Sequence, residues 1–356
     1  MTYRADMSPL RISSSAPRRP IIGRFTIVLA TLAAIVGALL MPAAAGAAPP
    51  SGEVVVANRG SGDISVINTA SLDVNTVALP GENAEPMYVS HDTRHNRVLV
   101  GDRGSSNIVA FDDETYEVVG SVAVGDGIFH QWADSDREQL WVVGTTNSTV
   151  SVVDTENLSL VTTFSLPAEV IADGGVPHDV FVANNHAYVS VLGLSDGSGL
   201  VIQYSTKDFS ETGRIDSGGD PHLFVRGGKL YVASQEASSI SRFNANTLAP
   251  LGSQTVPAAH GLYLTNRNEV FVTNIAGGGS DALWELDGQL AAVTDVADTA
   301  PPVPHNLTVD NSRQLWVTHS GGTADQVSVV QLDNSGFGQS TTVTVGTNPF
   351  GLAFVR

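Results

Sequence analysis

Short runs rich in β-branched and aromatic residues recur from Ser51 to the end of the chain, separated by clusters of Gly, Asn, Asp and Ser. Examples are RVLVGD at 97–102 and KLYVAS at 229–234. Runs of this length bounded by turn-forming residues predict β-strands. No stretch shows a convincing helical period, so we expect an all-β protein.

The predicted strands repeat as a unit of about 40 to 50 residues, and each of seven units can be aligned as four strands. The second strands begin at Val54, Arg97, Gln139, His186, Lys229, Glu269 and Gln314. Four-stranded units at this period are typical of propeller blades. The sequence therefore predicts one seven-bladed β-propeller domain over residues 49–356, with no second domain.

The two ends of the folded region lie at different points of the repeat. The chain enters the pattern with a second-type strand at Val54 and finishes with a first-type strand at 351–355. We expect the C-terminal strand to complete the blade that the N-terminal strands begin, which hides sheet edges.

One position of the repeat carries most of the chemistry, namely the residue near the start of each first strand. It is histidine in five consecutive units, separated by 48, 44, 38 and 45 residues: His130, His178, His222, His260 and His305. The other two units have Met87 and Phe350 there. An apolar residue always follows two positions later, as Val180 follows His178. This spacing predicts that both side chains share one strand face.

First strands line the central channel of a propeller, so equivalent positions lie on one circle, and the five imidazoles are expected to converge at one mouth. Neutral imidazole is a common ligand for zinc and also suits copper. Three or four imidazoles satisfy tetrahedral zinc, so five exceed what one ion can use.

Carboxylates close in sequence to these histidines are predicted to orient an imidazole or to act as extra ligands. They are Asp126, Asp173, Asp179 and Asp220. His319 ends a second strand and is expected to emerge at the same face as a weaker ligand. The remaining histidines of the repeat, His91, His95 and His186, are interpreted as surface residues.

The first 48 residues have the features of a cleaved signal peptide. Five arginines precede the apolar run 25–40, and small residues follow it at 42–48. A basic start, a short apolar segment and an A-x-A site are typical of export signals. Sixteen apolar residues are short for a membrane span. We therefore expect a secreted or periplasmic protein without a membrane anchor after cleavage.

Composition narrows the chemistry further. The leader contains five of the 18 basic residues and one of the 36 acidic ones, which leaves 13 against 35, a net charge of −22. Such a surface repels nucleic acid and anionic membranes and attracts cations. The chain has no cysteine, so any metal site must use histidine, carboxylate or carbonyl ligands.

The second strands carry a recognisable motif, FVTN at 271–274, with the variants YVAS, WVTH and VVAN. It resembles the YVTN-type propellers of secreted and surface-layer proteins, over essentially the whole mature chain. With its histidine ring, the chain also resembles the periplasmic zinc metallochaperones. That resemblance implies zinc bound in the channel and passed to the solute-binding protein of a zinc ABC importer, by a monomer that is not an enzyme.

Two other classes of function stay open. One is a lactonase or lyase in which a channel histidine acts as general base beside a divalent ion. The other is an interaction scaffold that binds no metal. For the metal-binding interpretation, an unperturbed histidine pKa of about 6.5 predicts that affinity falls steeply between pH 7 and pH 5.

Overall fold

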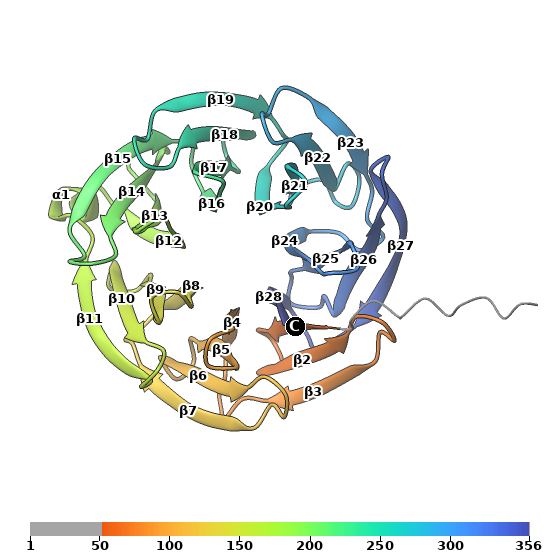
Figure 1. Cartoon of the computed structure of the whole chain (residues 1–356), viewed down its shortest axis with the longest axis horizontal. Coiled ribbons are helices and arrows are strands. Elements are labelled where there is room, and N and C mark those ends of the chain that lie inside the picture. Colours follow the sequence, from red (N-terminus) through yellow and green to blue (C-terminus); the bar gives the residue numbers. More distant parts are fainter. Residues whose placement is uncertain (1–51, 356) are drawn as a thin grey trace, which may run out of the picture. The chain divides into compact units, whose positions relative to one another are not determined.

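The computed structural model describes residues 52–355, which form seven four-stranded antiparallel sheets around a central axis (Figure 1). This confirms the predicted seven-bladed β-propeller. The predicted leader lies outside the described residues.

The four strands of each blade run outward from the channel (Figure 1). The innermost strands are β4 (Pro86–Asp92), β8 (Ile128–Asp134), β12 (Val176–Ala183), β16 (Pro221–Arg226), β20 (Ala259–Leu264), β24 (Pro304–Val309) and β28 (Pro349–Val355). The second strands are β1 (Glu53–Asn58), β5 (Arg97–Asp102), β9 (Gln139–Gly144), β13 (His186–Leu192), β17 (Lys229–Ser234), β21 (Glu269–Asn274) and β25 (Gln314–His319). The third are β2 (Asp63–Asn68), β6 (Asn107–Asp112), β10 (Thr149–Asp154), β14 (Gly199–Ser205), β18 (Ser239–Asn244), β22 (Leu283–Asp287) and β26 (Gln326–Leu332). The outermost are β3 (Val74–Ala78), β7 (Val118–Ala123), β11 (Ser159–Ser165), β15 (Glu211–Ser217), β19 (Pro250–Thr255), β23 (Val293–Ala297) and β27 (Phe337–Thr344).

The aromatic residue of the second-strand motif is what holds neighbouring blades together. Trp141, Tyr188, Tyr231, Phe271 and Trp316 are all at most 2% exposed. Two of them also reach the next blade through hydrogen bonds: Tyr188 Oη donates to the carbonyl of Ala245, and Tyr231 Oη donates to that of Gly288, each at 2.7 Å. Burying one aromatic side chain stabilises the fold by about 2–3 kcal/mol. The motif is therefore a sign of packing between blades and not of a binding site.

The ring closes as the sequence predicts. Strand β28 pairs antiparallel with β1, with Glu53 opposite Val355. Val54, Val55 and Val56 of β1 are completely buried in this blade.

Deleting Pro349–Val355 is therefore expected to abolish cooperative folding, because the inner edge of β1 and its buried valines would face solvent. Thermal unfolding followed by circular dichroism measures this. A cooperative transition at the full-length temperature would contradict the closure.

Six of the seven inner strands have a register shift where they begin, between a residue one or two positions before the repeat's histidine position and the strand body. Only β16 pairs regularly from its first residue, among the inner strands described. Bulges of this kind redirect side chains and commonly lie beside functional sites.

The predicted sharing of one face holds in β16, where His222 and Phe224 both line the channel, but the register shift breaks it in β12. In β12 the register slips between Pro177 and Val180. Val180 is 1% exposed in an inter-blade cluster that includes Val189, whereas Phe181 lines the channel. Strict alternation from His178 would have placed Val180 in the channel instead.

One helix was not predicted. Helix α1 (Ala168–Ala172) lies between β11 and β12 and buries Val170. Five residues are too few to produce a helical period in the sequence. Within residues 52–355 no helix has the length and apolarity needed to cross a bilayer.

Candidate metal centre

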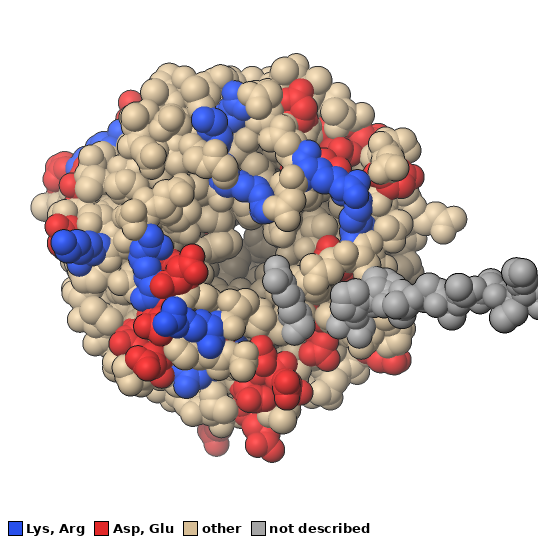
Figure 2. Space-filling model, viewed as in Figure 1, with Lys and Arg blue, Asp and Glu red and all other residues tan. Residues whose placement is uncertain are grey.

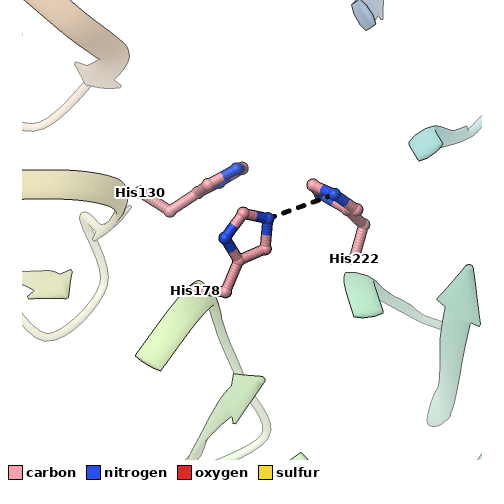
Figure 3. Close-up of side chains that lie close together, drawn as sticks. All are labelled: His130, His178 and His222. Atoms are coloured by element: carbon pink, nitrogen blue, oxygen red, sulfur yellow. Dashed lines mark hydrogen bonds between the residues drawn. The ribbon is translucent and has the colours of Figure 1, made fainter. Parts of the chain in front are cut away.

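The five predicted histidines lie side by side near the starts of β8, β12, β16, β20 and β24, and all are 3–9% exposed. Their ring centroids follow one another at 5.5 Å, 4.7 Å, 3.8 Å and 4.6 Å from His130 to His305. Figure 3 shows three of them, His130, His178 and His222, pointing toward one another from separate blades. The structure thus brings the five imidazoles together at one end of the channel.

Aromatic and sulfur side chains close the rest of the circle. The two blades without the histidine contribute Met87 and Phe350, which form a buried cluster with Tyr88. The Tyr88 ring lies 3.5 Å from that of His130, and the Phe350 ring 4.3 Å from that of His305. The polar side chains are therefore confined to one arc of the ring.

Three donor atoms lie close together, on His178, His222 and Asp220. The two Nε2 atoms are 3.3 Å apart, and Oδ1 of Asp220 lies 3.1 Å from His178 Nε2 and 3.6 Å from His222 Nε2. Two ligands at about 2.0–2.1 Å from a tetrahedral zinc are about 3.3–3.4 Å from each other. The three atoms are thus spaced like one face of a zinc coordination tetrahedron.

The repeat itself places Asp220 there. Asp220 precedes the Pro-His pair that opens β16 and has φ +52°. Val303 and Asn348, at the same place in their blades, also have positive φ, at 56° and 54°. The backbone turn is therefore shared by several blades, and this blade uses it to present a carboxylate.

His130 has one ring nitrogen free for a metal. Its Nδ1 lies 2.8 Å from Oδ1 of Asp179, so the proton is on Nδ1 and the Nε2 lone pair is available. That Nε2 is buried without a hydrogen-bond partner. Asp179 is fixed in turn, because its Oδ2 accepts from the backbone N–H of Leu223 at 2.8 Å. A carboxylate that orients a histidine in this way is a common outer partner of a metal ligand.

His260 has the same arrangement with a neutral partner. Its Nδ1 donates to Oε1 of Gln235 at 2.9 Å, and its Nε2 is buried without a partner.

His305 has partners of another kind. Its Nδ1 lies 2.8 Å from the amide nitrogen of Asn306, and its ring also bonds the carbonyl of Phe350. With its ring engaged in this way, the fifth imidazole is a weaker candidate ligand than the other four.

Two overlapping sets of three donors follow from these positions. Within each set all donor atoms lie within 4.8 Å of one another: His130, His178 and His222 in the first, Asp220, His222 and His260 in the second. His222 belongs to both sets.

Burial favours the neutral form of four of these imidazoles, those of His130, His178, His260 and His305. It lowers the pKa of His130 to about 4, against the opposing effect of Asp179. Burial also lowers the pKa of His178, and it holds those of His260 and His305 well below the ordinary value, with neighbouring imidazoles adding to the effect. Burial alone would raise the pKa of the Asp220 carboxyl, but its contacts with His178 and His222 lower it instead. The cluster therefore combines neutral imidazoles with ionised carboxylates, the protonation states that a divalent cation requires.

The other predicted residues lie apart from this cluster. Asp126 and Asp173 are exposed and bind the hydroxyls of Ser106 and Ser195. His319 is completely buried, with Nδ1 2.9 Å from the carbonyl of Pro302 and Nε2 2.8 Å from Oγ of Ser328. Both nitrogens of His319 are thus engaged within its own blade and loop.

Replacing His319 with alanine is expected to lower the free energy of unfolding by about 2–4 kcal/mol, because it removes a packed ring and leaves two buried polar groups unpaired. Zinc affinity should stay within about twofold. Urea unfolding and zinc titration measure the two quantities. A large loss of zinc affinity without loss of stability would return His319 to the ligand set.

The interpretation of His91 and His95 as surface residues is wrong. Their side chains are 10% and 16% exposed, and each contacts a carboxylate, Asp113 at 2.8 Å and Asp92 at 2.7 Å respectively. His186 is half-buried.

Sequence reasoning missed Gln235 and Asn306, which contact imidazole nitrogens, and Tyr88, which helps to close the ring. Asp179 was predicted to orient an imidazole or to act as an extra ligand, and its carboxylate does bind one, that of His130 in the preceding blade and not that of its sequence neighbour His178. Such contacts can be found in the sequence by asking whether the residue after each histidine could bind the histidine of the adjacent blade.

No protein-family profile and no curated protein sequence matches the chain. Solved structures share the fold. A protein from Lactobacillus plantarum has 15% identity and a TM-score of 0.70, covering 86% of this chain and 100% of its own. A periplasmic gluconolactonase of Pseudomonas aeruginosa has 18% identity and a TM-score of 0.68, covering 86% and 99%. A putative 6-phosphogluconolactonase from Bacteroides fragilis has 14% identity and a TM-score of 0.67, covering 86% and 98%.

The expectation that the protein is not an enzyme is corrected by these likenesses. Two of the structures with this fold are named as lactonases. At identities below 20% the likeness establishes the propeller fold alone, and the fold is compatible with catalysis.

Proposed function

We propose that the protein binds one zinc ion at the channel histidines, through Nε2 of His178, Nε2 of His222 and Oδ1 of Asp220. The fourth ligand is Nε2 of either His130 or His260, since each is buried and unpartnered. The observation that carries the proposal is the spacing of the first three atoms at 3.1–3.6 Å. Copper is the alternative ion, because imidazole and carboxylate ligands suit both.

We infer that the bound ion is cargo, delivered by an exported monomeric metallochaperone to the solute-binding protein of a zinc ABC importer. In this proposal residues 1–48 are the cleaved signal peptide and 49–356 the single secreted or periplasmic domain. Two donor sets that share His222 support a cargo role, because the ion can exchange one ligand at a time.

The charge around this end of the channel also supports a cation as cargo. Among the described loops that lead into the inner strands or join second to third strands, the basic residues are Arg59 and Arg103 alone. The acidic residues of the same loops are Glu82, Glu85, Asp126, Glu169, Asp173, Asp196, Asp220, Glu236, Asp281, Asp298 and Asp325. An acidic surface of this kind raises the local concentration of cations and speeds their arrival.

Zinc titration and transfer test the proposal together. Isothermal titration of metal-free protein is expected to give one zinc per chain, and elemental analysis of freshly purified protein should find the same metal. A zinc-loaded sample mixed with a metal-free zinc-binding protein of the importer class should lose its metal faster than by simple dissociation. Absence of zinc binding would contradict the site, and transfer no faster than dissociation would contradict the delivery role.

A second candidate function is hydrolysis of a lactone by the same site. It is favoured by a cavity of about 490 Å³ that His130 and His222 line, and by the two lactonase names among similar folds. There a bound zinc would polarise the lactone carbonyl. Turnover of a lactone panel by zinc-loaded protein that disappears in His178→Ala/His222→Ala would favour it, and absence of turnover by the wild-type protein would dismiss it.

A further inference from the structure

The cavity beyond the histidines has the dimensions of a ligand site. Its volume of about 490 Å³ falls within the range of small-molecule pockets. His130, His222, Tyr88 and Asn306 line its histidine end, and residues later in the inner strands form its walls. Figure 2 shows the molecule hollowed at the centre. The cavity therefore follows the channel away from the imidazoles.

The two sides of this cavity differ. Four aromatic rings from consecutive blades line one side, and we call them the aromatic arc: Trp132, Phe181, Phe224 and Tyr263. Their neighbouring centroids are 3.7 Å, 4.8 Å and 5.2 Å apart. Ser90, Leu307 and Ala353 line the other side, with the larger Phe354 beside them. A flat ring can stack on the arc while the smaller residues leave room for it.

Charged residues of both signs stand at the far end of the channel. No Lys or Arg is among the described residues that line the cavity. Figure 2 shows basic residues around the central opening, with acidic ones among them. At the hairpins that join inner to second strands the basic residues are Arg94, Arg97, Arg137, Arg226, Lys229, Arg267 and Arg313, and the acidic ones are Asp92, Asp134, Asp136, Glu138, Glu269 and Asp310.

Four of these basic residues have no acidic partner in residues 52–355, and one of them is Arg97, which donates to the carbonyls of Thr155 and Glu156. Arg226 donates to the carbonyl of Leu264 at 3.0 Å and Arg267 to Oδ1 of Asn334 at 3.4 Å. Neither they nor Lys229 form an ion pair with any residue in 52–355. These unpaired cations attract anions locally at this mouth.

We propose that the cavity binds a small cyclic carboxylate, with its ring against the aromatic arc and its carboxylate toward the histidines. The part of this proposal that directs the carboxylate toward the histidines rests on the proposed function, which places zinc there. The lone pair on the unprotonated Nε2 of His130 would repel a carboxylate placed beside it. A zinc ion bound between the imidazole and the carboxylate removes this repulsion, because zinc coordinates carboxylate oxygens. The ligand and the cation approach the cluster from opposite ends of the channel.

The test uses 2-naphthoate as probe, zinc-loaded and zinc-free protein, and one cavity-filling variant. Ala353→Phe fills the wall opposite the arc without touching the donor atoms, and Ala123→Phe makes the same change on exposed outer strand β7. Binding is measured by isothermal titration and by quenching of tryptophan fluorescence, with zinc content determined in each sample. We expect zinc-loaded protein to bind 2-naphthoate at least about tenfold more tightly than zinc-free protein. Ala353→Phe should weaken that binding at least about tenfold, and Ala123→Phe should leave it unchanged.

Equal affinity in Ala353→Phe and wild type, or no binding by zinc-loaded protein, overturns the proposal while the zinc site stands. Equal affinity of zinc-loaded and zinc-free protein for 2-naphthoate overturns the claim that the metal ion binds the carboxylate. The zinc content is measured before 2-naphthoate is added. If the protein has taken up no zinc at that stage, the proposed function and this inference are both overturned.

Discussion

Zinc affinity falls about a thousandfold or more when His178 and His222 are both replaced by alanine. The two imidazoles supply two of the three donor atoms spaced at 3.1–3.6 Å, and His222 belongs to both overlapping donor sets. Since a four-ligand zinc site is worth about 10–16 kcal/mol in total, losing two ligands removes several kcal/mol of binding free energy. Competition titration against a chelator of known affinity measures the change.

A matched variant separates this effect from a general loss of histidines. His95→Ala/His186→Ala removes two imidazoles outside the cluster and should bind zinc as the wild type does. Circular dichroism checks that both double variants fold. Wild-type affinity in His178→Ala/His222→Ala, or an equal loss in the matched variant, would place the metal elsewhere.

The zinc-free protein loses stability as the pH falls from about 6.5 toward 4. Burial lowers the pKa values of His130, His178, His260, His305 and His319 in the folded state. The unfolded chain, with histidine pKa values of about 6.5, therefore binds more protons in this window, so stability is complete above it and decreases below it. For His130, whose pKa is lowered to about 4, the linkage is on the order of 3 kcal/mol.

Urea unfolding at pH 7, 6, 5 and 4 in the presence of a chelator measures this loss. Zinc should raise the midpoint at pH 7 by binding the folded state alone. A midpoint that is constant from pH 7 to pH 4 would mean that the imidazoles are not buried in neutral form.

The same pKa shifts change the pH dependence predicted for metal binding. An unperturbed histidine would lose zinc between pH 7 and pH 5. With the pKa of His130 near 4 and that of His178 lowered, proton competition at these two ligands is displaced to more acidic pH.

The repeat made the fold and the histidine ring predictable, because one position recurs in every blade and inner strands surround a common axis. Contacts between blades were not predictable in the same way. Asp179 follows His178 in sequence but binds His130, and Nδ1 of His305 is engaged by the amide of Asn306. Such effects depend on side-chain directions at the bulged strand starts, which a period of two does not describe.

The function of the ring was less predictable than its position. Asp126, Asp173 and Asp220 all stand in loops before inner strands, yet Asp220 alone of the three lies against the imidazoles. Loop conformation decides between them, and the same fold accommodates both carriers and enzymes.

Anomalous X-ray scattering at the zinc absorption edge, from crystals of the zinc-loaded protein, tests the central claim most directly. One peak per chain is expected in the channel, about 2.0–2.1 Å from Nε2 of both His178 and His222, with Asp220 as a further ligand. A channel without a peak, or a zinc ion bound only to residues outside the histidine ring, would contradict it.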